Sequence, residues 1–335
     1  MSKKPFIIAE AAQGYAPIND SKPSLDIAIL LVRAAASAGA DAVKFQIIFI
    51  DELAEPGYEH YELFKNLKMT LKEWRVVRDE AKKLSLKFYA DIFGEKSLDI
   101  AKQINVDGIK IHSTSFFDEK LFRKTLNLGK PIYVSLGGIK PKEISKFIDN
   151  HNLRKHTSKI ILMHGFQSEP TPINYNNIAR IPELAELTGL EIGFMDHSDG
   201  GKDDFINISI MALANGVRYF EKHITLDRAV KIEDYISAIP PNQFSNYVKT
   251  IKRLYPAIGK ASLSLTDQEE KYRDGAIKKI IALKNIKKGA VIKNSDLTSI
   301  RRPNKKGFYS VSDVVGKQAS KDIRKGSIIN PTAIK

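Results

Sequence analysis

The chain has 335 residues, 43% of them hydrophobic, which suffices for one large domain and a smaller one, and no apolar run approaches the about 18 residues of a membrane span. It lacks cysteine, which excludes disulfides, thiolate metal sites and cysteine nucleophiles, and the N-terminal apolar run is too short for a secretory signal, so we expect a cytoplasmic protein without a membrane partner. The net charge of +14 would suit nucleic acid, but the lysines are spread along the chain without a zinc-finger or RNP-type signature, which favours a solvated surface and a phosphorylated substrate over a nucleic-acid partner.

The first 256 residues alternate between short apolar runs and longer amphipathic stretches. The runs that predict strands are Phe6–Ala9, Ala42–Gln46, Lys87–Asp91, Gly108–Ile111, Ile132–Ser135, Lys159–His164, Glu191–Met195 and Val217–His223. Between them, segments with helical periodicity include 24–39, 70–84, 142–151, 204–216 and 242–255.

This alternation predicts an α/β fold built from right-handed βαβ units with parallel strands. Eight units in about 250 residues predict a (β/α)8 TIM barrel over residues 1–258. A doubly wound open sheet is the alternative, but AEAAQGY (9–15), which ends the first strand, is not the G-x-G-x-x-G turn that such a fold would offer.

The C-terminal part of the chain has a different pattern. Residues 259–275 are polar and charged and are interpreted as a linker. Residues 276–335 contain short β-like runs, and the phrases KNIKKGAVI (284–292) and KDIRKGSII (321–329) form a near-repeat. We therefore expect a small, mostly β domain over residues 276–335.

In such a barrel the chemistry is expected where strands end at their carboxyl side. Each polar residue there has an ordinary alternative, as a solvated charge or a structural histidine, but polar groups end all eight predicted strands. Lys44, Lys110, Ser113 and Ser135 are donors suited to an anion. His197 and His223 end adjacent strands and could share a divalent metal. An anion site beside a Lewis-acidic metal predicts aldol-type condensation of a phosphorylated enol with a carbonyl compound.

These residues stand in phrases that resemble the sialic acid synthases, together with the legionaminic and pseudaminic acid synthases and the spore-coat polysaccharide proteins. The matching phrases are IIAE (7–10), AGADAVKFQ (38–46), GIKIHS (108–113), PIYVSLGG (131–138), IGFMDHSDG (192–200), EKHITLD (221–227) and IRRPNKKGF (300–308). The resemblance covers almost the whole chain, and it identifies the C-terminal region as an SAF domain similar to type III antifreeze proteins.

The resemblance implies condensation of phosphoenolpyruvate with an N-acetylated hexosamine, such as N-acetylmannosamine, to give a nine-carbon 2-keto acid sugar and phosphate. It implies that Lys44, Lys110, Ser113 and Ser135 hold phosphoenolpyruvate, that Glu10 acts at the reacting centre with Gln46 beside it, that Asp234 and Gln167 contact the sugar, and that His197 and His223 bind Mn²⁺, with Mg²⁺ or Co²⁺ as alternatives. It also implies a domain-swapped homodimer in which Arg302 reaches the sugar bound by the other protomer.

Five features depart from the family pattern. After the first strand, AEAAQGY lacks the usual histidine, and Ser115 stands in place of a second active-site glutamate. Met195 replaces a small hydroxyl residue, and Asp91 stands where a phosphate-binding hydroxyl is common. Gln167 and Glu169 replace an asparagine and a tyrosine that usually contact sugar. Two further readings therefore stay open: a related metal-dependent synthase with another acceptor or donor, and a non-catalytic carbohydrate-binding relic.

Overall fold

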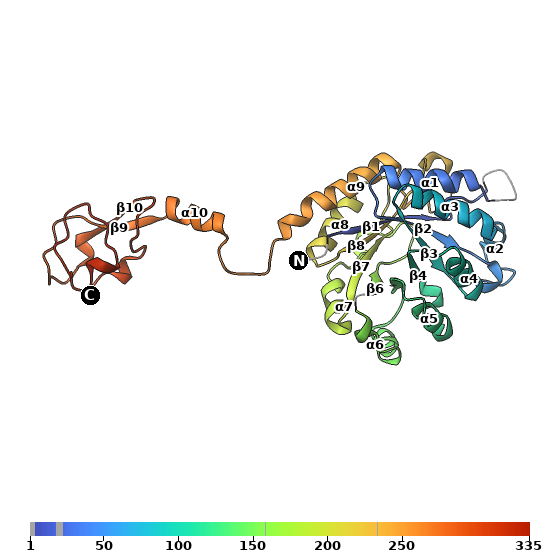
Figure 1. The fold of residues 1–335 in the computed structure, drawn as a ribbon, viewed down its shortest axis with the longest axis horizontal. Helices are drawn as coiled ribbons and strands as arrows, with labels where there is room; N and C mark the ends of the chain where they lie inside the picture. The colour runs from blue at the N-terminus through green and yellow to red at the C-terminus, as the bar shows by residue number, and fades with distance from the viewer. Residues whose placement is uncertain (1–3, 18–22, 158, 233) are drawn as a thin grey trace. The chain divides into compact units, whose positions relative to one another are not determined.

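The computed structural model describes residues 4–17, 23–157, 159–232 and 234–335 (Figure 1). The chain divides into two compact units, Met1–Gly259 and Lys260–Lys335.

The first unit is a closed barrel of eight parallel strands in sequence order, with β1 paired to β8. The strands are β1 (Phe6–Ala12), β2 (Ala42–Ile47), β3 (Lys87–Ile92), β4 (Gly108–Ile111), β5 (Ile132–Ser135), β6 (Ile160–His164), β7 (Glu191–Asp196) and β8 (Tyr219–His223). All eight predicted strands are present, and the predicted TIM barrel is confirmed, whereas the doubly wound sheet is wrong.

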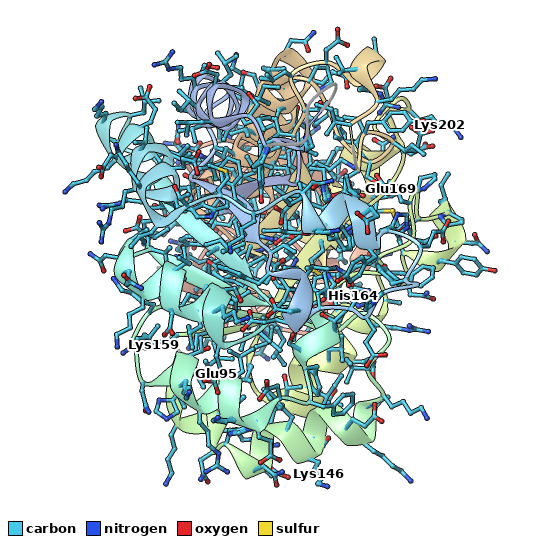
Figure 2. The ribbon with its side chains drawn as sticks, turned by 90° about the vertical axis from the view of Figure 1, so that its right-hand side faces the viewer. Glu95, Lys146, Lys159, His164, Glu169 and Lys202 are labelled. Atoms are coloured by element: carbon cyan, nitrogen blue, oxygen red, sulfur yellow. The ribbon has the colours of Figure 1, made fainter. Side chains whose placement is uncertain are left out.

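Helices connect consecutive strands and surround the barrel (Figure 1). They are α1 (Leu25–Ser37), α2 (Tyr61–Lys65), α3 (Leu71–Lys83), α4 (Glu95–Gln103), α5 (Glu119–Leu126), α6 (Pro141–Asn150), α7 (Arg180–Thr188), α8 (Asp204–Ala214) and α9 (Pro241–Leu254). Capping explains where α3 starts, because Thr70 and Glu73 form a capping box. No helix in the described part of the chain is long and apolar enough to cross a membrane. Lys146, Lys159 and Lys202 lie around the outer edge of this unit, as part of a solvated charged surface (Figure 2).

Alternation along each strand produces two apolar layers. Ile7 and Ala9 of β1 point outward into the core between strands and helices. Ile8 belongs instead to an inner apolar layer, which fills the barrel and whose buried members are Ile8, Ala42, Tyr89, Tyr133, Ile161, Met163 and Met195. Glu10 follows Ile8 with the same inward direction, so polar side chains at the strand ends lie next to a dry, packed interior.

The second unit contains helix α10 (Asp267–Ala276) and the antiparallel strands β9 (Lys278–Ala282) and β10 (Leu297–Arg301). The helix lies in the segment that we interpreted as a linker, where Thr266 and Glu269 form a capping box. The two halves of the near-repeat pair with each other, because Ile286 and Ile323 exchange backbone hydrogen bonds of 2.9 and 2.8 Å.

The glycines of the near-repeat sit in left-handed backbone conformations, with φ of 82° at Gly289 and 79° at Gly326. We expect Gly326→Ala to destabilise this unit by about 1–2 kcal/mol, because a Cβ is strained at this φ. Gly275 in α10 has open space for a Cβ, so Gly275→Ala is the control and should be neutral or slightly stabilising. Chemical denaturation of the two variants checks this; equal stabilities would contradict the conformational argument.

Candidate active site

A cavity of about 280 Å³, here called the central pocket, opens at the carboxyl ends of the strands. Seven of the predicted site residues line it: Glu10, Gln46, Lys110, Gln167, His197, His223 and Asp234. Other lining residues include Gln13, His60, His112, Glu169 and Glu221.

Two lysines and three carboxylates form a buried cluster beneath this pocket. Lys44 Nζ contacts the Glu10 carboxylate directly and lies 3.1 Å from Asp91 Oδ2 and 3.6 Å from Glu221 Oε2. Lys110 Nζ lies 2.6 Å from Glu221 Oε1 and 3.7 Å from Asp91 Oδ2. All five side chains are at most 2% exposed, so their charges interact through little solvent.

The mutual pairing sets the charge of this cluster. Burial alone would raise the pKa of Glu221, but Lys110 and Lys44 lower it to about 2, so Glu221 is ionised. The pKa of Lys110 is raised, because Glu221 and Asp91 outweigh the effect of burial. Burial lowers the pKa of Lys44, although Asp91 and Glu221 oppose this effect. Lys110 is therefore a firmly held cation at the pocket wall, and the pKa of Lys44 lies below its ordinary value.

Asp91 does not lie unpaired beside an anion site. Its carboxylate contacts both Lys44 and Lys110, and its Oδ1 atom has no hydrogen-bond partner within the described residues. An anion entering the central pocket must therefore compete with Asp91 for the two ammonium groups.

The two predicted metal ligands lie together. His197 Nε2 and His223 Nε2 are 3.3 Å apart, and Asp234 Oδ2 lies 3.6 Å from His223 Nδ1. Burial lowers the pKa of His197 to about 3 and that of His223 well below its usual value, so both rings are neutral, the form that binds metals. With bonds of about 2.0–2.1 Å, two imidazoles on one ion lie about 3.0–3.4 Å apart, so this spacing fits a shared ion. Since no group of three or more candidate ligands converges in the part of the chain described, water or substrate oxygens would complete the coordination.

Gln167 connects the two predicted serines. Its Oε1 accepts hydrogen bonds from Ser113 Oγ at 2.8 Å and Ser135 Oγ at 3.4 Å, and its Nε2 donates to His112 Nε2 at 3.1 Å. Gln13 follows the first strand, in the region where the family histidine is missing, and donates to Gln46 Oε1 at 2.6 Å. The hydroxyls of Ser113 and Ser135 therefore both donate to the Gln167 side-chain amide, which fixes their orientation.

The other singled-out residues lie away from the pocket wall or in the second unit. Lys44 is fully buried behind Glu10, and Met195 packs into the inner apolar layer. Ser115 donates to the Phe93 carbonyl at 2.8 Å. Arg302 belongs to the second unit, where its side chain is exposed.

Strand direction separates the polar strand ends into two sets. His164, Asp196 and Lys222 occupy the outward positions of their strands, whereas Glu221 and His223 point inward. Glu221 and His112 are the main site residues that were not predicted from the sequence, although the two-residue periodicity of a strand could have identified them. Each stands two positions from a selected residue, His223 or Lys110, and so shares its face.

Lys222 lies on the outward face of β8 and holds the two residues on either side of His197 in place. Its Nζ lies 3.3 Å from Asp196 Oδ2, donates to the Ser198 carbonyl at 2.8 Å and lies over the Phe205 ring. We expect Lys222→Met to destabilise the barrel by about 3–5 kcal/mol, because it leaves the Asp196 carboxylate buried without a cation.

The control for Lys222→Met is Lys202→Met, which removes an exposed lysine and should change stability little. The double variant Lys222→Met/Asp196→Asn should recover part of the loss. Urea unfolding of the three variants measures this, and an unperturbed Lys222→Met variant would show that the pair does not stabilise the fold.

Comparisons with known proteins agree with this architecture. Residues 31–262 match the NeuB family, and residues 279–335 match the SAF domain. An uncharacterised protein of Methanocaldococcus jannaschii is 30% identical over 303 residues, which cover 90% of this chain and 85% of the relative. A pseudaminic acid synthase of Campylobacter jejuni is 29% identical over 98% of this chain and 96% of its own.

Among solved structures, the N-acetylneuraminic acid (sialic acid) synthetase of Leptospira borgpetersenii, in complex with citrate, superposes with a TM-score of 0.73. It is 27% identical and covers 82% of this chain and 93% of its own. With the family match spanning more than half of the sequence, the chain belongs to the NeuB family of sialic-acid-type synthases, and it is an enzyme of this family that carries a C-terminal SAF domain.

Proposed function

We propose that the protein condenses phosphoenolpyruvate with an N-acetylated hexosamine, of the N-acetylmannosamine kind, to give a sialic-acid-type 2-keto acid and phosphate. The observation that carries this proposal is the buried cluster of Lys44 and Lys110 with Glu10 and Glu221, next to the His197–His223 pair. The central pocket thus combines cations for an anionic donor, carboxylates for proton transfer and a pair of neutral imidazoles.

The proposed reaction consumes one water. C3 of phosphoenolpyruvate forms a bond to the aldehyde carbon, the aldehyde oxygen takes a proton, and positive charge develops at C2. Water adds to C2 and loses a proton, which gives a tetrahedral intermediate that carries a hydroxyl and the phosphate on C2. The bond between C2 and the phosphate oxygen then breaks, and the hydroxyl proton passes to the leaving phosphate as the keto group forms. Lys110 at the pocket wall holds the donor's anionic groups, Lys44 adds its charge from behind Glu10, and Glu10 stabilises the cationic carbon and accepts the proton of the water.

The two histidines extend this proposal to a divalent ion, with Mn²⁺ as the first candidate and Mg²⁺ or Co²⁺ as alternatives. His197 and His223 would hold it, since their Nε2 atoms are 3.3 Å apart and both rings are neutral. A bound divalent ion supplies Lewis acidity toward a carbonyl oxygen. Asp234 lies at the same wall of the pocket and is placed to accept a sugar hydroxyl.

Asp91 favours a second candidate, a synthase of the same chemistry with a different donor. The buried Asp91 carboxylate already engages both lysines, so a less highly charged donor such as pyruvate would meet less repulsion. A third candidate, the carbohydrate-binding relic, has no comparable observation in its favour.

Phosphate release distinguishes these candidates. The purified protein with Mn²⁺, phosphoenolpyruvate and a panel of 2-acetamido hexoses should release phosphate and form a periodate-reactive keto acid. A keto acid formed from pyruvate, without phosphate release, would favour the second candidate. Tight sugar binding without any turnover would favour the relic.

The family resemblance extends the proposal to a domain-swapped homodimer in which Arg302 of one protomer binds the acceptor sugar held by the other. We expect Arg302→Ala to raise KM for the sugar at least about tenfold, the effect of losing one charge-assisted hydrogen bond, with little change in KM for phosphoenolpyruvate. Steady-state kinetics with each substrate varied checks this, and sedimentation measures the oligomeric state. A loss confined to phosphoenolpyruvate would contradict a sugar-binding role.

A further inference from the structure

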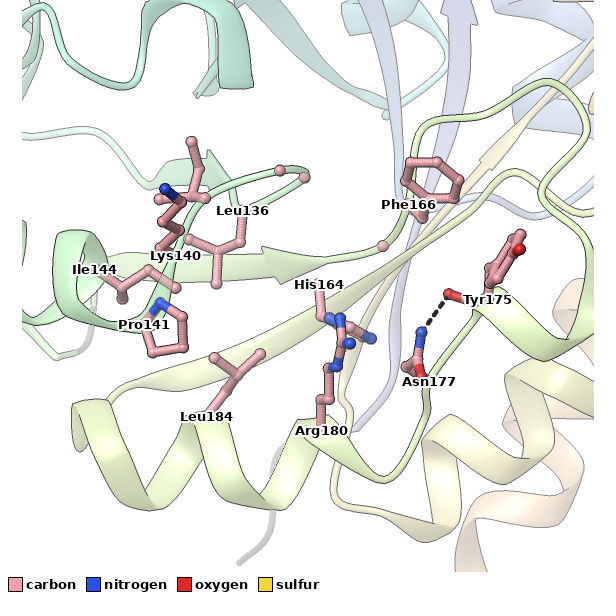
Figure 3. Close-up of a pocket in the computed structure, with 14 residues that line it drawn as sticks. Leu136, Lys140, Pro141, Ile144, His164, Phe166, Tyr175, Asn177, Arg180 and Leu184 are labelled. Atoms are coloured by element: carbon pink, nitrogen blue, oxygen red, sulfur yellow. Dashed lines mark hydrogen bonds between the residues drawn. The ribbon is translucent and has the colours of Figure 1, made fainter.

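A second and larger cavity, here called the side pocket, lies between the start of α6 and the start of α7 (Figure 3). Its volume is about 790 Å³, within the range of pockets that bind small molecules. It shares no lining residue with the central pocket. The larger cavity is therefore not the one that holds the buried charges.

The outward direction of His164 explains why this pocket forms. His164 ends β6 on the outer face of the barrel, and its Nε2 donates to the Asn176 carbonyl at 2.9 Å. Apolar side chains of the β5–α6 segment and of α7 form the other walls, among them Leu136, Ile144 and Leu184 (Figure 3).

The charged side chains of this pocket are all cationic. Lys140 and Arg180 line it, and none of its described lining residues is Asp or Glu. Neither side chain forms an ion pair with any residue that the structure describes, whereas Lys120 and Lys124 each pair with Glu95 nearby on the barrel surface. Arg180 lies beside His164 in Figure 3 and adds to the burial that lowers the pKa of this histidine. The pocket therefore offers two unneutralised cations.

Two helices point their N-terminal ends at the same space. Lys140 is the N-cap residue of α6, and Arg180 is the first residue of α7. The N–H groups of these helix ends are already engaged: in α7 those of Arg180 and Ile181 donate to the preceding turn, and the Lys140 N–H donates to the Glu143 carboxylate at 2.8 Å. The positive charge of the pocket therefore comes from the two side chains. Together these groups select an anion, and most strongly a phosphoryl group.

The remaining walls suit a flat apolar group better than a sugar. Phe166 and Tyr175 are 46% and 53% exposed, and their rings meet edge to face with centroids 6.1 Å apart. Asn177 directs its amide away from a ligand, donating to the Tyr175 carbonyl at 2.8 Å (Figure 3). The pocket thus presents aromatic faces beside its cations and few groups for hydroxyls.

We propose that the side pocket is a nucleotide-binding site, in which Arg180 and Lys140 hold the phosphate at the two helix ends while the base lies against Phe166 and Tyr175. The site is separate from the catalytic chemistry, and binding there does not require turnover. The two pockets lie back to back at Gly137, which lines the side pocket, and Gln167, which lines the central pocket. The two residues pack closely, because a Cβ on Gly137 would lie only 3.0 Å from Gln167 Oε1.

Isothermal titration of the full chain tests this site. The probes are AMP, GMP, CMP and UMP, with the four corresponding nucleosides and inorganic phosphate as partial ligands. We expect at least one nucleotide to bind with one-to-one stoichiometry, and its nucleoside and phosphate to bind at least about tenfold more weakly. Arg180→Gln should weaken the nucleotide by a similar factor, and Lys140→Gln provides a second variant. Lys146→Gln, an exposed lysine of α6 outside the pocket, is the matched control and should bind as the unmodified protein does.

Several results would overturn the proposal. Binding of no nucleotide at millimolar concentration would show that the pocket is not such a site. Binding unaffected by both Arg180→Gln and Lys140→Gln, or abolished by phosphoenolpyruvate, would place the ligand elsewhere. If inorganic phosphate binds as tightly as the nucleotides, the pocket is an anion site that does not recognise the base. None of these results depends on whether the protein releases phosphate from phosphoenolpyruvate, so the two proposals can fail independently.

Discussion

Lys110→Met should lower kcat/KM for phosphate release by about 100- to 1000-fold, the loss that follows removal of one preorganised electrostatic contact. Lys110 is the cation at the wall of the central pocket, and its ammonium lies 2.6 Å from Glu221. The substitution removes the charge that holds the donor and leaves Glu221 and Asp91 facing Lys44 alone. Phosphate release measures the effect on catalysis, and titration with phosphoenolpyruvate measures binding.

Because Lys110→Met leaves an uncompensated buried carboxylate, the variant should also be less stable. The double variant Lys110→Met/Glu221→Gln removes one of each charge and should recover stability without recovering turnover. Lys159→Met, an exposed lysine just before the amino end of β6, is the control and should retain full activity. If the double variant recovers turnover together with stability, Lys110 has a structural role only.

His223→Ala should abolish metal-dependent turnover and weaken Mn²⁺ binding by more than the roughly 10- to 100-fold that loss of an outer-shell partner costs. It removes one of the two neutral imidazoles whose Nε2 atoms lie 3.3 Å apart. Titration with Mn²⁺ measures binding, and chelation followed by Mn²⁺ addition tests whether turnover of the unmodified protein needs the ion.

The matched control is His164→Ala, since His164 also ends a strand but points outward to the side pocket. We expect it to keep both Mn²⁺ binding and turnover. Mn²⁺-dependent activity that survives in His223→Ala would rule out the metal assignment. Equal losses in the two variants would show that the assay reports damage to the fold.

The spacing of apolar residues in each segment was sufficient to predict the barrel. Apolar runs such as Gly108–Ile111 and Ile132–Ser135 match strands β4 and β5 residue for residue. Eight such runs separated by amphipathic helices leave few alternatives to a parallel barrel. The segment near Thr266 was harder, because α10 is short, polar and has no buried residue. Its start is set by a capping box, which is a weaker signal than an apolar stripe.

The sequence by itself therefore determined the eight barrel strands, their order, the family and seven of the residues that line the central pocket, because each of these depends on neighbours along the chain or on motifs. Only the tertiary structure decided which charges meet. Lys110 on β4 and Glu221 on β8 are separated by 111 residues and come from strands that do not pair, so their contact exists only because the sheet closes and their side chains point into the same interior. Parallel pairing of β3 with β2 and β4 places Asp91 between two lysines, while the outward face of β6 carries His164 away from them and into the side pocket.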